Sequence, residues 1–192
     1  MTSALTSTVM AARDRRSRLV AAALMEAVLL AGCTATDGDG ANARNELLML
    51  SLLTAQQSAD TTAIVELFWP DAVYDDYANQ LQYRGIEEIV GYVTSVHVWA
   101  DDVYLNAGEV HASPEGAVAE WLFAGVQARP MGDYVPTVTG REVVLNGVTI
   151  IEVDGGRIRR GADYMDTAPL ALQLGGRIEL PGGQVIELQA GN

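Results

Sequence analysis

The chain has 192 residues, 49% of them apolar, and this length and composition predict one globular domain with a substantial core. Its formal net charge is −13, all twelve basic residues are arginines, and no basic patch with interleaved aromatic residues follows the N-terminal segment. Because contact with phosphate needs clustered positive charge, this composition argues against a nucleic-acid partner.

The N-terminal segment has the parts of a bacterial export signal. A basic run, ARDRRSR at 12–18, precedes the apolar run LVAAALMEAVLL at 19–30, which is short for a bilayer span and typical of a signal peptide. LAGC at 30–33 then resembles the lipobox of bacterial lipoproteins, a family in which the cysteine, here Cys33, is acylated with diacylglycerol. Glu26 departs from the pattern because a charge disfavours membrane insertion. The alternative is a mis-assigned start followed by an amphipathic tail with a free thiol.

The lipobox resemblance implies that residues 1–32 are removed and that lipid on Cys33 holds the protein on the extracytoplasmic face of the cell membrane. The remaining chain is acidic, so we expect membrane contact through the lipid alone. Residues 33–43 are mostly small and polar, which predicts a flexible linker. Cys33 is the single cysteine, so no disulfide within the chain is possible.

Two helices are predicted next. RNELLMLSLLTAQQSA at 44–59 is apolar on nearly all sides around 47–53, which is typical of a buried helix. TTAIVELF at 61–68 predicts a short second helix, for which Asp60 is a plausible N-cap.

A strand and a third helix follow. DAVYDDY at 71–77 has the pattern of a strand. GIEEIVGYVTSVHVW at 85–99 predicts an amphipathic helix, and Glu87 and Glu88 in its first turn are favourable at the positive end of the helix dipole.

After Trp99 the hydrophobic pattern changes to a period of two, which predicts strands. Four are expected, at 102–112, 116–129, 141–154 and 156–166. The longer loop at 130–140 contains two prolines and is placed to cover one end of a pocket. Helices followed by an antiparallel meander predict an α+β fold with helices on one face of a curved sheet. Within the C-terminal extension at 169–192, residues 177–188 predict a hairpin that extends the sheet or contacts another protomer.

Three segments carry a resemblance to a known family. FWPDAVYDD…YRGIEEIVGYV, GAVAEWLFAGVQ and TGREVVLNGVTIIEVDGGRIRRGADYMDT, in this order, resemble the SnoaL-like domain of the nuclear transport factor 2-like superfamily. The resemblance covers residues 44–168 and implies a cone-shaped barrel whose curved, mainly antiparallel sheet encloses a deep apolar pocket. Relatives include polyketide ester cyclases, ketosteroid isomerase, limonene-epoxide hydrolase and scytalone dehydratase, alongside binding proteins without catalysis. Fold alone does not choose between these functions.

The resemblance suggests two candidate catalytic acids. Asp163, in DYMD at 163–166, takes the position of the aspartate that activates water in limonene-epoxide hydrolases, whereas their Arg-x-Asp is replaced by EWL at 120–122. Asp76 takes the position of the general base of ketosteroid isomerases. The first-helix tyrosine and strand acid of their oxyanion hole are missing here, because helix 44–59 has no tyrosine and the strand position is Val148 or Thr149.

The residues themselves leave two interpretations of Asp163 open. As a general base it needs a raised pKa, which apolar neighbours in a dry pocket would supply. Alternatively, an ion pair of Asp163 with an arginine fixes the strand register, and three arginines are available: Arg141, Arg159 and Arg160. Strand alternation places Asp76 on one face with Tyr74, and puts Tyr164 and Asp166 on the face opposite Asp163. The candidate ligand contacts are Tyr74, Trp121, Phe123 and Tyr164.

Two functions follow from these patterns. The first is a lipid-anchored pocket protein for a small hydrophobic molecule. As an enzyme it would work without a cofactor by isomerisation, cyclisation or hydration, with Asp163 abstracting a proton or activating water. The second is a non-catalytic ligand-binding or protein-interaction domain, for which the family resemblance implies a homodimer formed through the outer face of the sheet. We expect no metal site, since the candidate ligands His97, Asp101, Asp102 and His111 have no zinc-site spacing.

Overall fold

The computed structural model describes residues 37–133 and 135–187. The export signal predicted at residues 1–32 and the acylation site predicted at Cys33 lie outside the described residues. Among the helices that are described, none combines the length and the hydropathy needed to cross a membrane.

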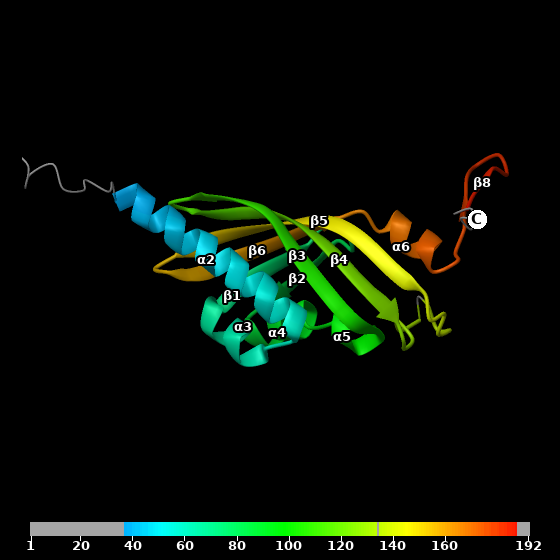
Figure 1. The fold of residues 1–192 in the computed structure, drawn as a ribbon, viewed down its shortest axis with the longest axis horizontal. Helices are drawn as coiled ribbons and strands as arrows, with labels where there is room; N and C mark the ends of the chain where they lie inside the picture. Colours follow the sequence, from blue (N-terminus) through cyan, green and yellow to red (C-terminus); the bar gives the residue numbers. More distant parts are fainter. Residues whose placement is uncertain (1–36, 134, 188–192) are drawn as a thin grey trace, which may run out of the picture. The chain divides into compact units, whose positions relative to one another are not determined.

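Five helices and eight strands make up the described chain (Figure 1). The helices are α2 (Asp37–Ser58), α3 (Thr61–Leu67), α4 (Ile86–Val93), α5 (Val96–Trp99) and α6 (Ala168–Gln173). The strands are β1 (Phe68–Asp76), β2 (Leu81–Arg84), β3 (Ala100–Ser113), β4 (Gly116–Gln127), β5 (Glu142–Asp154), β6 (Arg157–Met165), β7 (Ile178–Glu179) and β8 (Val185–Ile186).

Six strands form one sheet in the order β2-β1-β6-β5-β4-β3. The β3–β4–β5–β6 meander is antiparallel throughout, as the alternating hydrophobic pattern predicts. The early strand β1 pairs in parallel with the last strand of the meander, β6, and its other edge pairs antiparallel with β2. In this register Asp76 lies opposite Asp163, so the two candidate acids become neighbours on adjacent strands.

Helix α2 covers the inner face of the sheet where β3 and β4 run (Figure 1). Met49, Leu52 and Leu53 are spaced along one side of this helix and are buried in the core. In the N-terminal half of the helix, the buried Asn45 donates its side-chain amide to the carbonyls of Ser113, at 2.8 Å, and Pro114, at 3.2 Å. These two bonds fix the helix to the turn between β3 and β4.

This curved, mainly antiparallel sheet with helices on its inner face confirms the predicted α+β fold. The Asp60 side chain accepts a hydrogen bond from the backbone N–H of Ala63 at 3.0 Å and caps α3. Helix α2 begins earlier than the pattern predicts, so residues 37–43 belong to it and not to a linker. The segment predicted as one helix at 85–99 is divided into α4 and α5.

Two elements near the cavity have no counterpart in the prediction. Strand β2 has four residues and α6 has six, lengths at which hydrophobic periodicity gives little signal. The C-terminal strands β7 and β8 pair with each other on either side of residues 181–183 and form a sheet of their own. They do not extend the six-stranded sheet.

Candidate active site in the interior cavity

A cavity of about 500 Å³ lies on the inner face of the sheet. Apolar side chains form most of its wall, among them Val93, Val96, Trp99, Val103, Leu105, Trp121, Phe123, Leu145, Met165, Leu170 and Leu174. They come from α4, α5, α6 and four neighbouring strands, and Met131 and Val135 of the loop between β4 and β5 add to the wall. A volume of this order suits one small organic molecule.

Asp163 is the acid at the centre of this wall, 3% exposed. Its Oδ1 accepts hydrogen bonds from the Tyr74 hydroxyl at 2.9 Å and from the Thr149 hydroxyl at 2.6 Å. Its Oδ2 accepts one bond, from the Tyr92 hydroxyl at 3.0 Å. These donors come from β1, β5 and α4, so three separate elements hold one carboxylate.

A further bond extends this network across the sheet. The indole Nε1 of Trp121 donates to the Thr149 oxygen at 2.9 Å. Because the Thr149 hydroxyl has one proton and its oxygen already accepts from Trp121, that proton is directed at Asp163. Trp121 therefore both lines the cavity and fixes the orientation of a donor to the acid.

Burial raises the pKa of Asp163 from 3.8 to about 6. The hydrogen bonds from Thr149, Tyr74 and Tyr92 oppose this change, because they stabilise the charged form. The nearby carboxylate of Asp76 adds to the increase. The acid is thus poised close to neutrality, where a side chain exchanges a proton most effectively.

The tyrosines around the acid stay protonated. Desolvation, followed by the charge of Asp163, raises the pKa of both Tyr74 and Tyr92 well above its ordinary value. Tyr92 also stacks on Tyr83, with ring centroids 4.5 Å apart and planes at 21°, and both rings line the cavity. The tyrosine hydroxyls are therefore fixed donors at neutral pH.

Asp76 is a second buried carboxylate on the cavity wall, 1% exposed. Its Oδ1 accepts from the backbone N–H of Asn79 at 3.1 Å, and its Oδ2 accepts from the Asn79 side chain at 2.7 Å. Both partners are neutral, as are those of Asp163.

None of the three candidate arginines contacts Asp163. Arg160 lies on the outer face and bridges Asp75 and Glu152, with N–O distances of 2.7 and 2.8 Å. Arg159 pairs with Asp71, and Arg141 donates to the backbone carbonyl of Gln173. The polar partners of Asp163 are hydroxyl groups instead.

Two glycines make room for the aromatic donors. A Cβ at Gly161 would lie 2.4 Å from the Tyr74 ring, and a Cβ at Gly147 would lie 2.2 Å from the Trp121 indole. Both distances are far below van der Waals contact, so a larger residue in place of Gly161 or Gly147 would displace the ring that lies over it. Each aromatic ring lies across a neighbouring strand only because that strand has no side chain there.

The predicted site residues divide between the two faces of the sheet. Asp163, Asp76, Trp121 and Phe123 line the cavity, while Tyr74 is fully buried behind Asp163 and reaches it through its hydroxyl. Tyr164 lies on the outer face, 43% exposed, as strand alternation requires.

Sequence reasoning did not identify Tyr92 as a partner of Asp163. The available signal was its position in the predicted helix, three residues after the buried Ile89 and next to the buried Val93. The family resemblance places Thr149 or Val148 at the position of an oxyanion-hole acid and gives no signal that Thr149 donates to Asp163.

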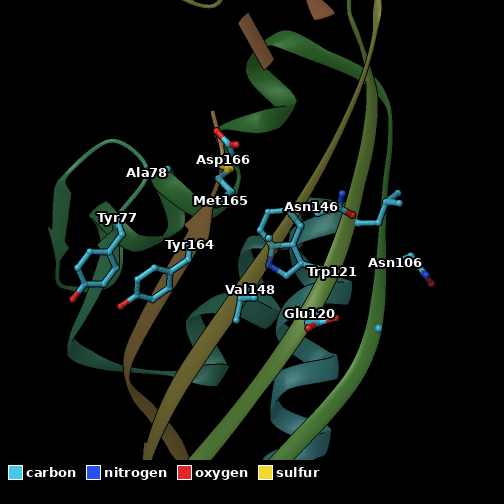
Figure 2. A pocket seen from close by; sticks show the side chains of 13 residues that line it. Tyr77, Ala78, Asn106, Glu120, Trp121, Asn146, Val148, Tyr164, Met165 and Asp166 are labelled. Atoms are coloured by element: carbon cyan, nitrogen blue, oxygen red, sulfur yellow. The ribbon is translucent and has the colours of Figure 1, made fainter. Parts of the chain in front are cut away.

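A wider, open groove of about 860 Å³ lies on the outer face, and Figure 2 shows the side chains that line it. Tyr77 and Tyr164 stack at one end, with centroids 4.4 Å apart and planes at 14°. The groove continues over Val148, Glu120 and the edge of the Trp121 indole. Its lining does not include Asp76 or Asp163, and its two acids, Glu120 and Asp166, are exposed, so the interior cavity is the better candidate for chemistry.

No cluster of three or more His, Cys, Asp or Glu side chains suited to holding a metal ion occurs in residues 37–133 and 135–187. The site offers one buried acid of raised pKa, fixed hydroxyl donors and an apolar wall. Such groups suit proton transfer with a bound organic molecule.

A curved, mainly antiparallel sheet around an apolar cavity, with a buried acid on the cavity wall, defines the class of protein to which the chain is similar. The family model for the SnoaL-like domain matches residues 50–161. The chain belongs to this family, as the sequence resemblance implied.

Solved structures share the fold. TsrD from Streptomyces laurentii is 25% identical, with a TM-score of 0.60 over 69% of this chain and 96% of TsrD. A protein described as a SnoaL-like polyketide cyclase from Jannaschia sp. is 16% identical, with a TM-score of 0.63 over 69% of this chain and 92% of its own. An LEH-like epoxide hydrolase of M. tuberculosis is 17% identical, with a TM-score of 0.55 over 69% and 90%. No curated protein matches the chain.

Proposed function

We propose that this protein binds a small hydrophobic molecule in the interior cavity and transfers a proton through Asp163 without a cofactor. The observation that carries the proposal is the environment of Asp163. The acid is buried in the wall of an apolar cavity, accepts three hydroxyl hydrogen bonds and has no arginine partner among the described residues. Its pKa of about 6 lets it accept a proton at neutral pH and release it again.

The two oxygens of Asp163 differ in their capacity to accept a proton. Oδ1 already accepts two bonds, from Tyr74 and Thr149, whereas Oδ2 accepts one, from Tyr92. A proton removed from a bound carbon acid or water is therefore best placed on Oδ2. That step frees the Tyr92 hydroxyl, which also lines the cavity, to donate to an oxygen of the bound molecule. An isomerase, cyclase or hydratase reaction fits this exchange.

The test combines ligand binding with proton exchange. Thermal-shift screening of the purified full-length chain against small hydrophobic ketones, epoxides and alcohols should yield stabilising ligands. For a bound ketone, NMR in D₂O should show exchange of its α-protons at a rate that Asp163→Asn lowers by about 10²-fold or more, while the thermal shift persists. Asp166→Asn is the control, because that side chain lines the outer groove. Equal exchange rates in Asp163→Asn and wild type would rule out the catalytic role, and no stabilising ligand would rule out the pocket function.

The second candidate is a non-catalytic interaction domain that dimerises through the outer face. Support comes from the outer groove and from exposed aromatic side chains on the same face, Tyr77, Tyr104 and Tyr164. Sedimentation of the wild-type chain should then show a dimer, and Tyr164→Arg should dissociate it. The control is Leu47→Arg, which alters another exposed apolar residue, on α2. A wild-type monomer at all accessible concentrations would contradict this candidate.

Attachment to the membrane is part of the proposal and rests on sequence alone. Its support is the order of basic run, apolar run and LAGC ending at Cys33. In a bacterial host, Cys33→Ala should abolish labelling with radioactive palmitate and move the protein out of the membrane fraction. Unchanged labelling of the variant would contradict acylation at this residue.

A further inference from the structure

The charges on the cavity wall are all of one sign. Asp76 and Asp163 lie opposite each other on β1 and β6, at 1% and 3% exposure, and both line the cavity. Within the described residues, the lining includes no Arg or His, and the chain has no Lys. Arg159 and Arg160 of β6 pair instead with Asp71 and Asp75, which do not line the cavity. Buried carboxylates in proteins ordinarily have a cationic partner, and these two have only neutral donors.

Neutral donors leave most of the negative charge uncompensated. Asp163 has three hydroxyl partners and Asp76 has the two N–H groups of Asn79. The carboxylates also act on each other, since the charge of Asp76 raises the pKa of Asp163. A cation between the two carboxylates would offset their repulsion and supply the cationic partner that they lack. Its attraction to them would be strong because the buried site has a low dielectric constant.

The aromatic part of the wall favours the same kind of group. The stacked pair Tyr83 and Tyr92 lies beside the two acids, and Trp99 and Trp121 complete the wall. The faces of such rings attract cations, most strongly when the contact is sheltered from water. An anionic molecule would meet two carboxylates with no basic side chain among the described lining residues, and a neutral one would leave the charge pair unchanged.

We propose that the molecule that fills this cavity is a protonated amine on an apolar body, with its ammonium group held between Asp76 and Asp163 and against the Tyr83–Tyr92 pair. This inference rests on the proposed function of the cavity and specifies its ligand class.

Three probes with one apolar body test the inference: 2-(1-naphthyl)ethylamine, 2-(1-naphthyl)ethanol and 1-naphthylacetate. Calorimetric titration of the full-length chain at pH 7.5 should give an affinity for the amine about tenfold or more above that for the alcohol, with the carboxylate weakest. Asp76→Asn should reduce the preference for the amine about tenfold and leave the alcohol affinity unchanged. Asp71→Asn removes the same charge from the same strand at an exposed position and should leave the preference intact.

The outcomes separate this inference from the proposed function. If the alcohol binds as tightly as the amine, the cavity is a binding site but the amine class is wrong. If Asp71→Asn reduces the preference as much as Asp76→Asn, the effect belongs to net charge and the inference is also wrong. Binding of none of the three probes, together with no stabilising ligand in the wider screen, would reject the cavity as a ligand site. Should Asp76→Asn fail to fold, the comparison of the three probes in the wild-type chain still decides.

Discussion

Asp163 shows how one side chain acquires its properties from residues far away in the sequence. Strand alternation is enough to predict that it faces away from Tyr164 and toward the inside. Its partners cannot be predicted in this way, because Tyr92 arrives on α4 and Tyr74 on β1. Three arginines were candidate partners in the sequence, and in the folded protein those arginines contact other residues.

The raised pKa of Asp163 has a consequence for stability. The folded protein binds the proton of this group more tightly than the unfolded chain, so its contribution to stability is fully present below pH 3.8 and is lost as the pH rises to about 6. In Asp163→Asn this contribution is absent at every pH. The free energy of unfolding of the variant, relative to wild type, should therefore rise by about 2 kcal/mol between pH 4 and pH 7.

Urea unfolding of both proteins across this pH range measures the difference. The comparison cancels the carboxylates away from the cavity, which change wild type and variant alike. A difference that stays constant from pH 4 to pH 7 would show that Asp163 has an ordinary pKa, and the base role would lose its physical support.

At the scale of elements, the position of each aromatic donor depends on the strand beside it. Gly161→Ala would force the Tyr74 ring away from β6, because its Cβ would overlap that ring. We expect a loss of about 2–3 kcal/mol in the free energy of unfolding from overpacking and from the broken bond to Asp163. The pKa of Asp163 should rise further, since one donor to the charged form is lost. Chemical denaturation and ¹³C NMR titration of the carboxyl group give the two quantities.

Gly91→Ala is the matched control for this substitution. Gly91 lies inside α4, and a Cβ there would meet nothing within 4 Å. Because alanine favours a helix, this change should stabilise the protein by about 0.5–1 kcal/mol. Equal effects of the two substitutions would contradict the role assigned to Gly161.

Helix α6 is attached to the sheet in a similarly local way. Strand β6 ends at Met165, which leaves Val144 of β5 without a strand partner on that side. The Gln173 side chain takes its place, since its oxygen accepts from the Val144 N–H at 2.6 Å and its nitrogen donates to the Val144 carbonyl at 2.8 Å. Leu170 and Leu174 are thereby held over the cavity.

Gln173→Ala should loosen this attachment. We expect amide hydrogen exchange at Val144 to become about tenfold faster or more, because local opening of the segment becomes easier. Gln173→Glu keeps the oxygen that accepts from the Val144 N–H but loses the donor to the Val144 carbonyl, so its protection should be intermediate. Unchanged exchange in Gln173→Ala would show that α6 is held by its apolar contacts alone.

For the whole molecule, sequence patterns were sufficient for the α+β class and for the β3–β6 meander, whose strands pair in chain order. They were not sufficient for the β1–β6 pairing, since a parallel contact between distant segments leaves no local periodicity. That pairing places Asp76 beside Asp163, so the candidate acids could be named from the sequence while their proximity could not. Short elements such as α6, which complete the cavity wall, were missed for lack of length.

The net charge of −13 acts on approaching molecules at the same scale. If the ligand is a protonated amine, the field of the acidic protein should speed its association, and salt should screen this effect. The association rate of 2-(1-naphthyl)ethylamine, followed by stopped-flow fluorescence, should fall about threefold or more between about 20 mM and about 500 mM NaCl. The rate for 2-(1-naphthyl)ethanol should stay constant, and equal salt dependence of the two would contradict attraction of the cation.

Trp121 borders both the interior cavity and the outer groove, because Gly147 leaves the sheet thin beneath its indole. Trp121 is therefore an intrinsic fluorescent probe at the boundary between the interior cavity and the outer groove. The fluorescence emission of Trp121 should change when a ligand enters the interior cavity and when a second protein covers the outer groove. With Trp69 and Trp99 replaced by phenylalanine, Trp121 would be the single tryptophan of the chain, and its emission would report on both events.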